Sequence, residues 1–503
     1  MTDQILGLDR ETIERARHSR DPRFDGRFFI GVKTTGIYCR PVCPVKTPKR
    51  ENVEIYSSAA AAGGAGYRPC MRCRPELAPG QIGWTKSGRH LLQALNLIDR
   101  EILNGISVDE IAAELQVSTR QLNRVFRQYL GTTPFRVAQT KRLHFAKQLI
   151  DETRLSMTEI CFAAGFGSIR RFNDVFNKTY GQSPSRLRKR RKSKSSIGQG
   201  VAVTLSYRLP FDWRYLLQFL SRRAISGMEV CGPTRYQRTI EIGTETGQIA
   251  VEFSIRKPEV RVLVDFPDTT LLLGIIERVR NLFDLNADSR CIDQTLAADS
   301  LIGDLVNTWP GVRVPGVWDG FEVAVRAIVG QQISVPAATT LLTRLVSHCG
   351  KQYAATGQNS NINSGTKLTH LFPTPQEILA SDIRGMGISD SRVEVLYSLC
   401  REVVSGNLRF DTYQDIESVK SRFKQIKGVG DWTAEYVAMR ALRDPNGFPH
   451  GDLILRRVAT TMDASCYGDA LLKKSRSWEP WRAYATMLMW RKHQEHQSQS
   501  VRG

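Results

Sequence analysis

Four cysteines, arranged as two close pairs, constrain the fold of the N-terminal region more than any other feature of the sequence. The pair Cys39 and Cys43 lies in YCRPVC, and the pair Cys70 and Cys73 lies in CMRC. Two pairs at this spacing are typical of a tetrahedral zinc site. A disulfide framework is the alternative, but the six remaining cysteines are scattered singly, as in a reducing compartment. We therefore predict one zinc ion held by four cysteines.

The length and charge of the chain predict several domains and a polyanionic partner. With 503 residues, the chain is too long for a single hydrophobic core. The formal net charge of +21 favours nucleic acid as the partner over a basic surface that is merely soluble. Because the sequence has no charged-then-apolar leader and no run of 18 apolar residues, we expect neither secretion nor a membrane span.

Segments that are poor in apolar residues divide the chain. The clearest is RLRKRRKSKSSIGQG, in which a basic run precedes a Ser/Gly stretch whose only apolar residue is Ile197. We expect the parts on either side of it, residues 1–192 and 201–503, to fold independently. A polar stretch at 350–370 predicts a surface loop. The predicted domains are residues 1–78, 86–190, 201–290 and 291–495, with residues 191–200 as the linker.

The pattern of apolar residues predicts helices throughout residues 86–190, where two segments follow one plan. In residues 107–131, a capping box of Ser107 and Glu110 opens a short helix, and a second helix follows after a break. Residues 156–181 repeat the plan with a glycine turn. Each segment is a candidate helix-turn-helix, whose second helix can lie in the major groove, although a plain helical bundle is the alternative. The second helices carry the candidate DNA-binding residues Arg120, Arg124, Arg170 and Arg171.

Taken together, residues 1–190 resemble a known family. The stretches FFIGVKTTGIYCRPVC, ENVEIY and YRPCMRCRPE precede the tandem helix-turn-helix. They resemble the N-terminal module of the Ada-type methylphosphotriester DNA methyltransferases, and the tandem repeat resembles an AraC-type DNA-binding domain. The resemblance implies that Cys39 is both a zinc ligand and the acceptor of a methyl group from a DNA phosphotriester. It gives the other three zinc ligands as Cys43, Cys70 and Cys73.

A zinc-bound cysteine suits this chemistry, because the thiolate is the nucleophile and zinc keeps it deprotonated. Spacing alone leaves a purely structural zinc site open. The resemblance also implies contacts of Thr35, Lys46 and Arg68 with DNA phosphates. Lys46 stands where arginine is usual in the family, which weakens a bidentate contact. The sequence lacks the PCHR motif of the second methyl-acceptor domain found in many family members.

The second half of the chain opens with strands and continues with helices. VAVTLSYRL, YQRTIEIG, GQIAVEFSIR and EVRVLVDF alternate apolar and polar residues, which predicts antiparallel strands. The helical stretches FDWRYLLQFLSRRA and TTLLLGIIERVRNLF accompany them, so we predict a small α+β domain. Beyond it the pattern is helical to the end.

A glycine hairpin in the last domain carries a second resemblance. Lys427 precedes Gly428 and Gly430 between helical segments, and such a hairpin can direct backbone N–H groups at a DNA phosphate. Asp452 follows Gly430 by 22 residues. This arrangement resembles the helix-hairpin-helix glycosylases. With VPGVWDGFEVAVRAIVGQQIS and WEPWRAYATMLMW, residues 200–495 resemble the AlkA-type 3-methyladenine DNA glycosylases.

The second resemblance implies several roles. Asp452 is the implied catalytic carboxylate, and the alternative is a helix cap. Gln332 is implied to fill the hole left by a flipped base, where the family usually has leucine. Trp432 stands where strand-cleaving relatives have lysine, so we expect a monofunctional enzyme. The hairpin residues Lys427, Gly428 and Gly430 are implied to bind DNA, with a monovalent cation. The implied base-binding residues are Phe219, Trp432, Tyr436 and Trp490, for which an ordinary core is the alternative.

These observations predict a multidomain α+β protein with a small four-cysteine zinc domain, an all-α tandem helix-turn-helix domain, a small α+β domain and an all-α helix-hairpin-helix glycosylase domain. We expect a bacterial cytoplasmic monomer that hydrolyses the N-glycosidic bond of alkylated purines such as 3-methyladenine in DNA. We also expect suicidal methyl transfer from DNA phosphotriesters, and transcriptional activation at promoter DNA with RNA polymerase as a partner. The alternative is a transcriptional regulator whose repair modules serve only as DNA-binding or sensing scaffolds.

Overall fold

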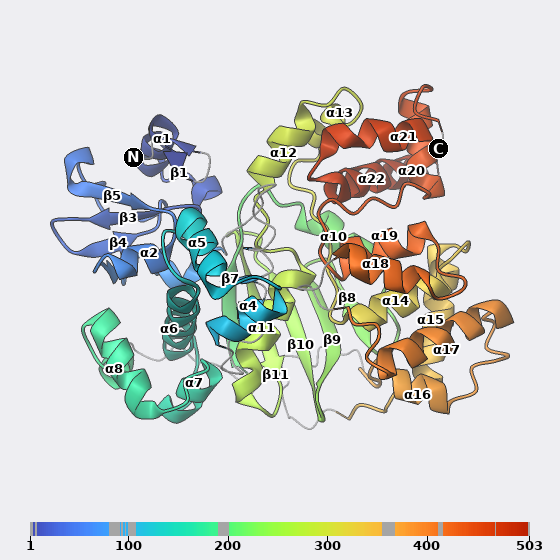
Figure 1. The fold of residues 1–503 in the computed structure, drawn as a ribbon, viewed down its shortest axis with the longest axis horizontal. Coiled ribbons are helices and arrows are strands. Elements are labelled where there is room, and N and C mark those ends of the chain that lie inside the picture. Colours follow the sequence, from blue (N-terminus) through green and yellow to red (C-terminus); the bar gives the residue numbers. More distant parts are fainter. Residues whose placement is uncertain are drawn as a thin grey trace. The chain divides into compact units, whose positions relative to one another are not determined.

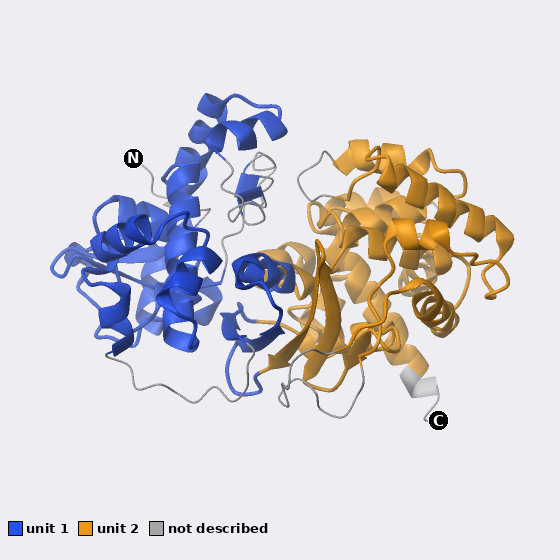
Figure 2. Cartoon of the chain, turned by 90° about the horizontal axis from the view of Figure 1, so that it is seen from below, with its two compact units in different colours: residues 1–209, 254–280, 285–287 blue, residues 210–253, 281–284, 288–503 orange. Residues whose placement is uncertain are grey.

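The computed structural model describes residues 4–5, 8–79, 91, 94–95, 97–98, 107–189, 201–354, 368–410, 416–467 and 469–500. The chain divides into two compact units, shown in Figure 2: residues 1–209, 254–280 and 285–287 in the first, and residues 210–253, 281–284 and 288–503 in the second. The predicted linker and most of the helical prediction before residue 107 lie outside the described residues, as does most of the predicted 350–370 loop. None of the described helices is long and apolar enough to cross a membrane.

A small sheet forms the centre of the N-terminal module. Its strand order is β5-β3-β4-β6, and Figure 1 shows the first three of these strands side by side. Strand β3 pairs antiparallel with its two neighbours, and β4 pairs parallel with β6. The strands are β3 (Phe29–Val32), β4 (Ile37–Cys39), β5 (Val53–Tyr56) and β6 (Arg68–Pro69). Because Cys39 ends β4 and Cys70 follows β6, the parallel pairing brings together the first cysteine of each pair.

Short elements surround this sheet. A two-stranded ribbon, β1 (Gln4–Ile5) with β2 (Leu8–Asp9), opens the chain. The helices are α1 (Arg10–Ser19) and α2 (Ala59–Gly64), with 3-10 turns η1 (Pro22–Phe24), η2 (Arg50–Asn52) and η3 (Pro75–Leu77). Buried Ile13, Phe24, Phe28 and Ile30 form a core under α1.

The described part of the second predicted domain is entirely helical. It comprises α4 (Val108–Glu114), α5 (Thr119–Leu130), α6 (Pro134–Glu152), α7 (Met157–Ala163), α8 (Ile169–Tyr180) and α9 (Pro184–Lys189). The predicted capping box is confirmed: Glu110 N–H donates to Ser107 Oγ at 3.1 Å, and Ser107 N–H donates to the Glu110 carboxylate at 2.7 Å. A second capping box at the start of α7 repeats it. The two predicted helix-turn-helix units are therefore present, as α4–α5 and α7–α8.

Helix α6 connects these units and also packs on the N-terminal module. The Tyr38 hydroxyl lies 2.9 Å from His144 Nε2, and Lys147 Nζ donates to Glu76 at 3.1 Å. Arg74, next to the zinc-ligand candidate Cys73, donates to Glu152 at 3.0 Å. Tyr38, Glu76 and Lys147 are buried and the other three side chains are half-buried, so the module and the helix-turn-helix pair share an ion-paired interface.

The predicted strands of the α+β region are all present. In the first unit β7 (Val201–Ser206) pairs antiparallel with β11 (Glu259–Asp265). In the second unit β8 (Glu229–Cys231), β9 (Arg235–Ile242) and β10 (Glu245–Phe253) form an antiparallel meander. The predicted helices are α10 (Trp213–Ser221) and α11 (Leu272–Leu282), the latter after η4 (Thr269–Leu271). Only the short β8 was not predicted.

Contacts within the first unit join residues from both sides of the predicted linker. Glu152 and Gln148 of α6 bind the backbone of Thr204 in β7, at 2.8 and 2.6 Å. Arg208, fully buried, donates to the carbonyl oxygens of Asp25 at 2.9 Å and Pro79 at 3.4 Å. These contacts show that the two parts touch within the first unit, and the expectation that residues 1–192 and 201–503 fold independently stays a prediction.

The rest of the second unit is helical, as predicted. Its elements are α12 (Ser289–Ala297), α13 (Gly303–Thr308), α14 (Gly320–Val329), α15 (Val335–Cys349), α16 (Pro375–Ala380), α17 (Asp390–Val404), α18 (Ile416–Lys424), α19 (Asp431–Arg440), α20 (Leu453–Met462), α21 (Asp469–Lys474), η5 (Ser475–Trp478) and α22 (Arg482–Ser500). The predicted division at residue 290 falls within α12.

Candidate functional site

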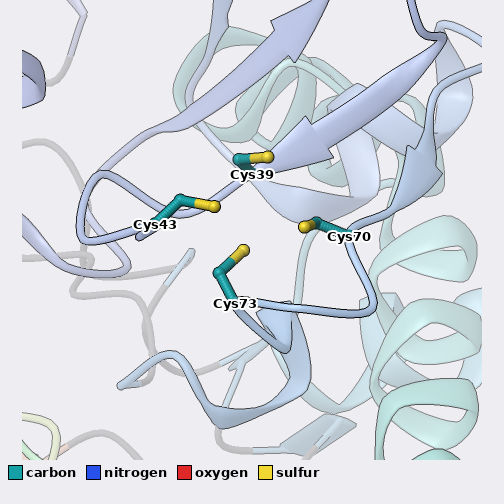
Figure 3. Close-up of side chains that lie close together, drawn as sticks. All are labelled: Cys39, Cys43, Cys70 and Cys73. Carbon is teal, nitrogen blue, oxygen red and sulfur yellow. The ribbon is translucent and has the colours of Figure 1, made fainter. Parts of the chain in front are cut away.

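The four cysteines of the N-terminal module form one buried cluster. Their sulfur atoms all lie within 4.8 Å of one another and point toward a common centre, as Figure 3 shows. A tetrahedral zinc ion with Zn–S bonds of about 2.3 Å separates its sulfur ligands by about 3.8 Å, so the cluster fits zinc with little movement. The four ligand candidates are Cys39, Cys43, Cys70 and Cys73.

The protonation of these thiols also indicates a cation. Hydrogen bonding with Cys43 and Cys70 raises the pKa of Cys39 well above its ordinary value, and Cys39 raises the pKa of Cys73 in the same way, whereas hydrogen bonding with Cys39 lowers the pKa values of Cys43 and Cys70. Without a cation, the four thiols therefore do not all ionise together, because several thiolates at this distance repel one another. A divalent metal removes that repulsion, so the donor set suits zinc in its fully ionised form.

An arginine that sequence reasoning missed supports the cluster. Arg40 directly follows Cys39, and its backbone N–H donates to Cys73 Sγ at 3.4 Å. Its side chain donates to the Cys73 carbonyl at 3.0 Å and to the buried Asp25 carboxylate at 2.8 Å. Arg40 thus fixes both halves of the cysteine site and adds positive charge beside the sulfur atoms. Asp25 lies 15 residues upstream, so only the folded chain reveals the pair.

The three residues that the first resemblance assigns to DNA phosphates all lie on the surface. Thr35 occupies the exposed turn between β3 and β4, and Arg68 N–H donates to the carbonyl of Gly36 in the same turn at 2.8 Å. Lys46 is exposed in the segment after Cys43. Their side chains are accessible, as a phosphate contact requires.

The two helix-turn-helix units expose their arginines in the same way. Helices α5 and α8 each bury one apolar face at the same spacing and direct the opposite face outward. The buried residues are Leu122, Phe126 and Leu130 in α5, and Phe172, Phe176 and Tyr180 in α8. The candidate DNA-binding residues Arg120, Arg124, Arg170 and Arg171 are all exposed.

In the second unit, two tryptophans converge on the carboxylate of Asp452. Trp432 Nε1 donates to Asp452 Oδ2 at 2.9 Å, and Trp490 Nε1 donates to Oδ1 at 3.2 Å. Asp452 is also the N-cap of α20, because the N–H groups of Ile454 and Leu455 donate to Oδ1 at 3.0 Å. The helix-cap alternative is therefore correct, but it does not replace the site, because Trp490 shares the capping oxygen Oδ1 and Trp432 holds the second oxygen, Oδ2.

Four aromatic side chains lie around this carboxylate, at different depths. Trp432 stacks on Tyr436 with ring centroids 5.4 Å apart, and Trp490 lies 6.1 Å from Tyr436. Phe219 stacks behind Trp490 at 6.2 Å and is fully buried. Of the four, Trp432 is the most accessible. Phe219 therefore supports the cluster from behind in this conformation.

Two arginines, the buried Arg440 and the half-buried Arg223, lie behind the aromatic cluster, and the sequence analysis did not single them out. Arg440 donates to the Tyr436 hydroxyl at 2.7 Å, and Arg223 lies 3.7 Å above the Phe219 ring. Burial alone would raise the pKa of Tyr436, but Arg440 and Arg223 lower it below its ordinary value. Tyr436 and Arg440 are four residues apart on one helix, a spacing that places them on the same face, so the sequence could have predicted this contact.

The glycine hairpin lies between α18 and α19 with an exposed Lys427 before it. Gly428 has φ of +99°, and Gly430 is the N-cap of α19. Its outer surface is accessible, which suits contact with a DNA phosphate. Gln332 is exposed at the turn between α14 and α15 and has φ of +56°.

We expect Gly428→Ala to lower both stability and DNA affinity. An added Cβ would lie 2.5 Å from Val395 Cγ2, and the backbone conformation at φ of +99° disfavours any side chain. Together these effects should cost roughly 1–3 kcal/mol and displace the hairpin. Thermal denaturation and equilibrium DNA binding measure the two effects. Gly430→Ala is the matched control for stability, since its Cβ would meet open space; an equal loss of stability in both variants would contradict the explanation.

Comparison with known families divides the chain into four matched regions. The models that match are the metal binding domain of Ada over residues 12–76, a helix-turn-helix domain over 111–190, the AlkA N-terminal domain over 202–319, and the HhH-GPD superfamily base excision DNA repair protein over 325–480. The cysteine cluster lies in the first region, and the hairpin and Asp452 lie in the last.

A relative shows the same combination over nearly its whole length. The probable bifunctional transcriptional activator/DNA repair enzyme AlkA of Mycobacterium tuberculosis is 35% identical over 486 residues, which is 96% of each chain. The chain belongs to the family of this AlkA protein. The match therefore extends across both halves of this chain.

Relatives of each half are also found. DNA-3-methyladenine glycosylase 2 of Escherichia coli is 27% identical over 57% of this chain and 96% of its own. The bifunctional transcriptional activator/DNA repair enzyme AdaA of Bacillus subtilis is 30% identical over 38% of this chain and 90% of its own. Among solved structures, a 3-methyladenine DNA glycosylase of Archaeoglobus fulgidus is similar with a TM-score of 0.50 and 19% identity, over 57% of this chain and 96% of its own, which indicates a shared fold.

Proposed function

We propose that this protein repairs alkylated DNA by two separate chemistries and regulates transcription through its helix-turn-helix units. The observation that carries the proposal is the Asp452 carboxylate held by two indole N–H groups beside stacked aromatic rings. The family membership and the cysteine cluster support the second chemistry.

The glycosylase reaction depends on an ionised carboxylate more than on a general acid. A purine methylated at N3 or N7 carries positive charge, so it leaves readily as a neutral base when its bond to the sugar breaks. Asp452 stabilises the positive charge that develops on the sugar, and water then adds to the anomeric carbon and loses a proton. Trp432 and Tyr436 offer electron-rich faces, and one such contact with a cationic ring contributes roughly 1–2 kcal/mol when desolvated.

Methyl transfer uses Cys39 and consumes it. Its sulfur attacks the methyl carbon of a phosphotriester, the bond from carbon to oxygen breaks, and the DNA keeps an ordinary phosphodiester anion. Zinc bound by Cys39, Cys43, Cys70 and Cys73 supplies the positive charge that keeps the thiolate ionised at neutral pH. Thr35, Lys46 and Arg68 bind neighbouring phosphates. The product is a thioether, which no residue of the chain can reverse.

Regulation follows from the same reaction. Conversion of a thiolate to a thioether removes negative charge from a surface that faces phosphates, which should raise the affinity for DNA. Arg120 and Arg124 of α5, with Arg170 and Arg171 of α8, then read the promoter. RNA polymerase as partner, a monovalent cation at the hairpin, a monomeric state and a cytoplasmic location belong to the same proposal.

A single incubation tests both chemistries. The purified chain is mixed with methylated DNA, and the released bases and the methyl groups bound to protein are measured separately. We expect both signals, because the two sites use different residues. Neither signal, together with retained binding to promoter DNA, would support the alternative in which the repair modules are only scaffolds.

A further inference from the structure

The turn that carries the exposed Gln332 is fastened to the glycine hairpin through one neighbouring side chain. Gln331 Nε2 donates to the Gly428 carbonyl at 3.1 Å and to Thr433 Oγ1 at 2.9 Å. An amide nitrogen carries two hydrogens, and both are used here. Because a carbonyl can only accept, the orientation of this amide is unambiguous. All of these residues lie in the second unit.

A third element holds the backbone of the same residue. The guanidinium of Arg392, in α17, donates to the Gln331 carbonyl. Gln332 itself has the left-handed φ of +56°, which a residue other than glycine keeps only when its surroundings impose it. The contacts of Gln331 supply that constraint, because they fix the residue immediately before Gln332 on both its side-chain and its backbone atoms.

The elements joined at Gln331 are those that the proposed glycosylase uses at different steps. Gly428 belongs to the hairpin proposed to bind phosphate. Thr433 is fully buried in α19, directly after Trp432, whose indole binds Asp452. The turn at Gln332 carries the side chain that is proposed to fill the hole left in the duplex by the flipped base. Their relative positions decide whether a base that leaves the helix arrives beside Asp452.

We infer that Gln331 is a positioning residue for base flipping, which holds the Gln332 turn in register with the hairpin and the base-binding helix. This inference depends on the proposed glycosylase activity. Gln331 acts before the bond to the sugar breaks, so its loss should slow the extrusion of a paired base. A lesion that is already unpaired costs less to extrude and should be insensitive to it.

The test uses the full chain and two duplexes that differ in one position. Both contain one 7-methylguanine, placed opposite cytosine in the first duplex and opposite an abasic site in the second. Gln331→Met keeps the length of the side chain and removes both N–H donors. In single-turnover measurements, we expect base release from the paired lesion to fall about tenfold, and release from the unpaired lesion to change by less than about threefold.

A second variant and a second signal keep the outcome interpretable. Thr433→Val removes one of the two acceptors, so it should show the same selectivity with a smaller loss, even if Gln331→Met fails to fold. A 2-aminopurine beside the lesion brightens when the base leaves the stack, and we expect less brightening with Gln331→Met.

Different results would contradict the role of Gln331 and the proposed glycosylase function. Equal losses on the two duplexes, or unchanged release and brightening with the paired lesion, would overturn the role of Gln331. If the wild-type chain releases no base from either duplex, the proposed function fails instead. The brightening then still reports whether Gln331 affects flipping.

Discussion

Asp452→Asn should lower the rate of base release by about 1,000-fold, with DNA binding largely retained. The asparagine side chain has the same shape but no charge, so it cannot stabilise positive charge on the sugar. It can still accept the N–H groups of Ile454 and Leu455, since asparagine caps helices about as well as aspartate. One indole N–H loses its acceptor, because the side-chain amide offers only one oxygen.

The measurement is single-turnover release of 7-methylguanine beside a binding curve for the same duplex. Asp431→Asn is the matched control, because Asp431 is an exposed carboxylate in the first turn of α19 whose partner is Lys424, at 2.8 Å. It should leave release nearly unchanged. Near wild-type release by the Asp452→Asn variant would remove this residue from the mechanism.

Cys39→Ala should abolish methyl transfer, from about one methyl group per chain to none, because the sulfur is the acceptor and is not regenerated. Alanine at Cys43, Cys70 or Cys73 leaves the acceptor in place but removes a zinc ligand, as Cys39→Ala also does. All four changes should therefore lower zinc content and destabilise the N-terminal module, while only Cys39→Ala removes the acceptor itself.

Labelled methyl on protein reports loss of the acceptor, while zinc content and thermal denaturation report loss of a ligand. Cys291→Ala serves as the control, since Cys291 lies in α12, outside the cluster, and its loss should change neither methyl uptake nor zinc content. If Cys39→Ala takes up as much methyl as the wild type, the acceptor lies elsewhere. Release of 7-methylguanine by the same proteins should persist, because Asp452 lies in the other unit.

Local patterns predicted most of the fold because their causes are local. Apolar periodicity placed the helices of both helix-turn-helix units and the four longer strands of the α+β region, and the Ser107 capping box formed as expected. The spacing of the cysteines predicted a cluster that the parallel pairing of β4 and β6 brings together. In each case the decisive neighbours are close in sequence or share one short motif.

The features that were missed depend on residues far apart in the chain. Arg40 meets Asp25, and Gln331 meets Gly428 across 97 residues, and no periodicity encodes such a pairing. The burial of Phe219 behind Trp490 likewise depends on tertiary packing. The resemblance names this residue as base-binding, but it gives no depth. Whether a side chain is accessible to a base can therefore be determined only from the folded structure.

The buried arginine at position 208 has a consequence for how such a chain could arise or be divided. Its guanidinium satisfies the carbonyls of Asp25 and Pro79 in the N-terminal module and of Asn286 in the glycosylase half. A gene split at residues 191–200 would leave that cation without two of its acceptors, and a bare buried charge is costly. Separately encoded halves would therefore need either a substitution at Arg208 or a strong tendency to reassociate. A single chain removes that requirement, and it also means that the two activities are inherited and produced together.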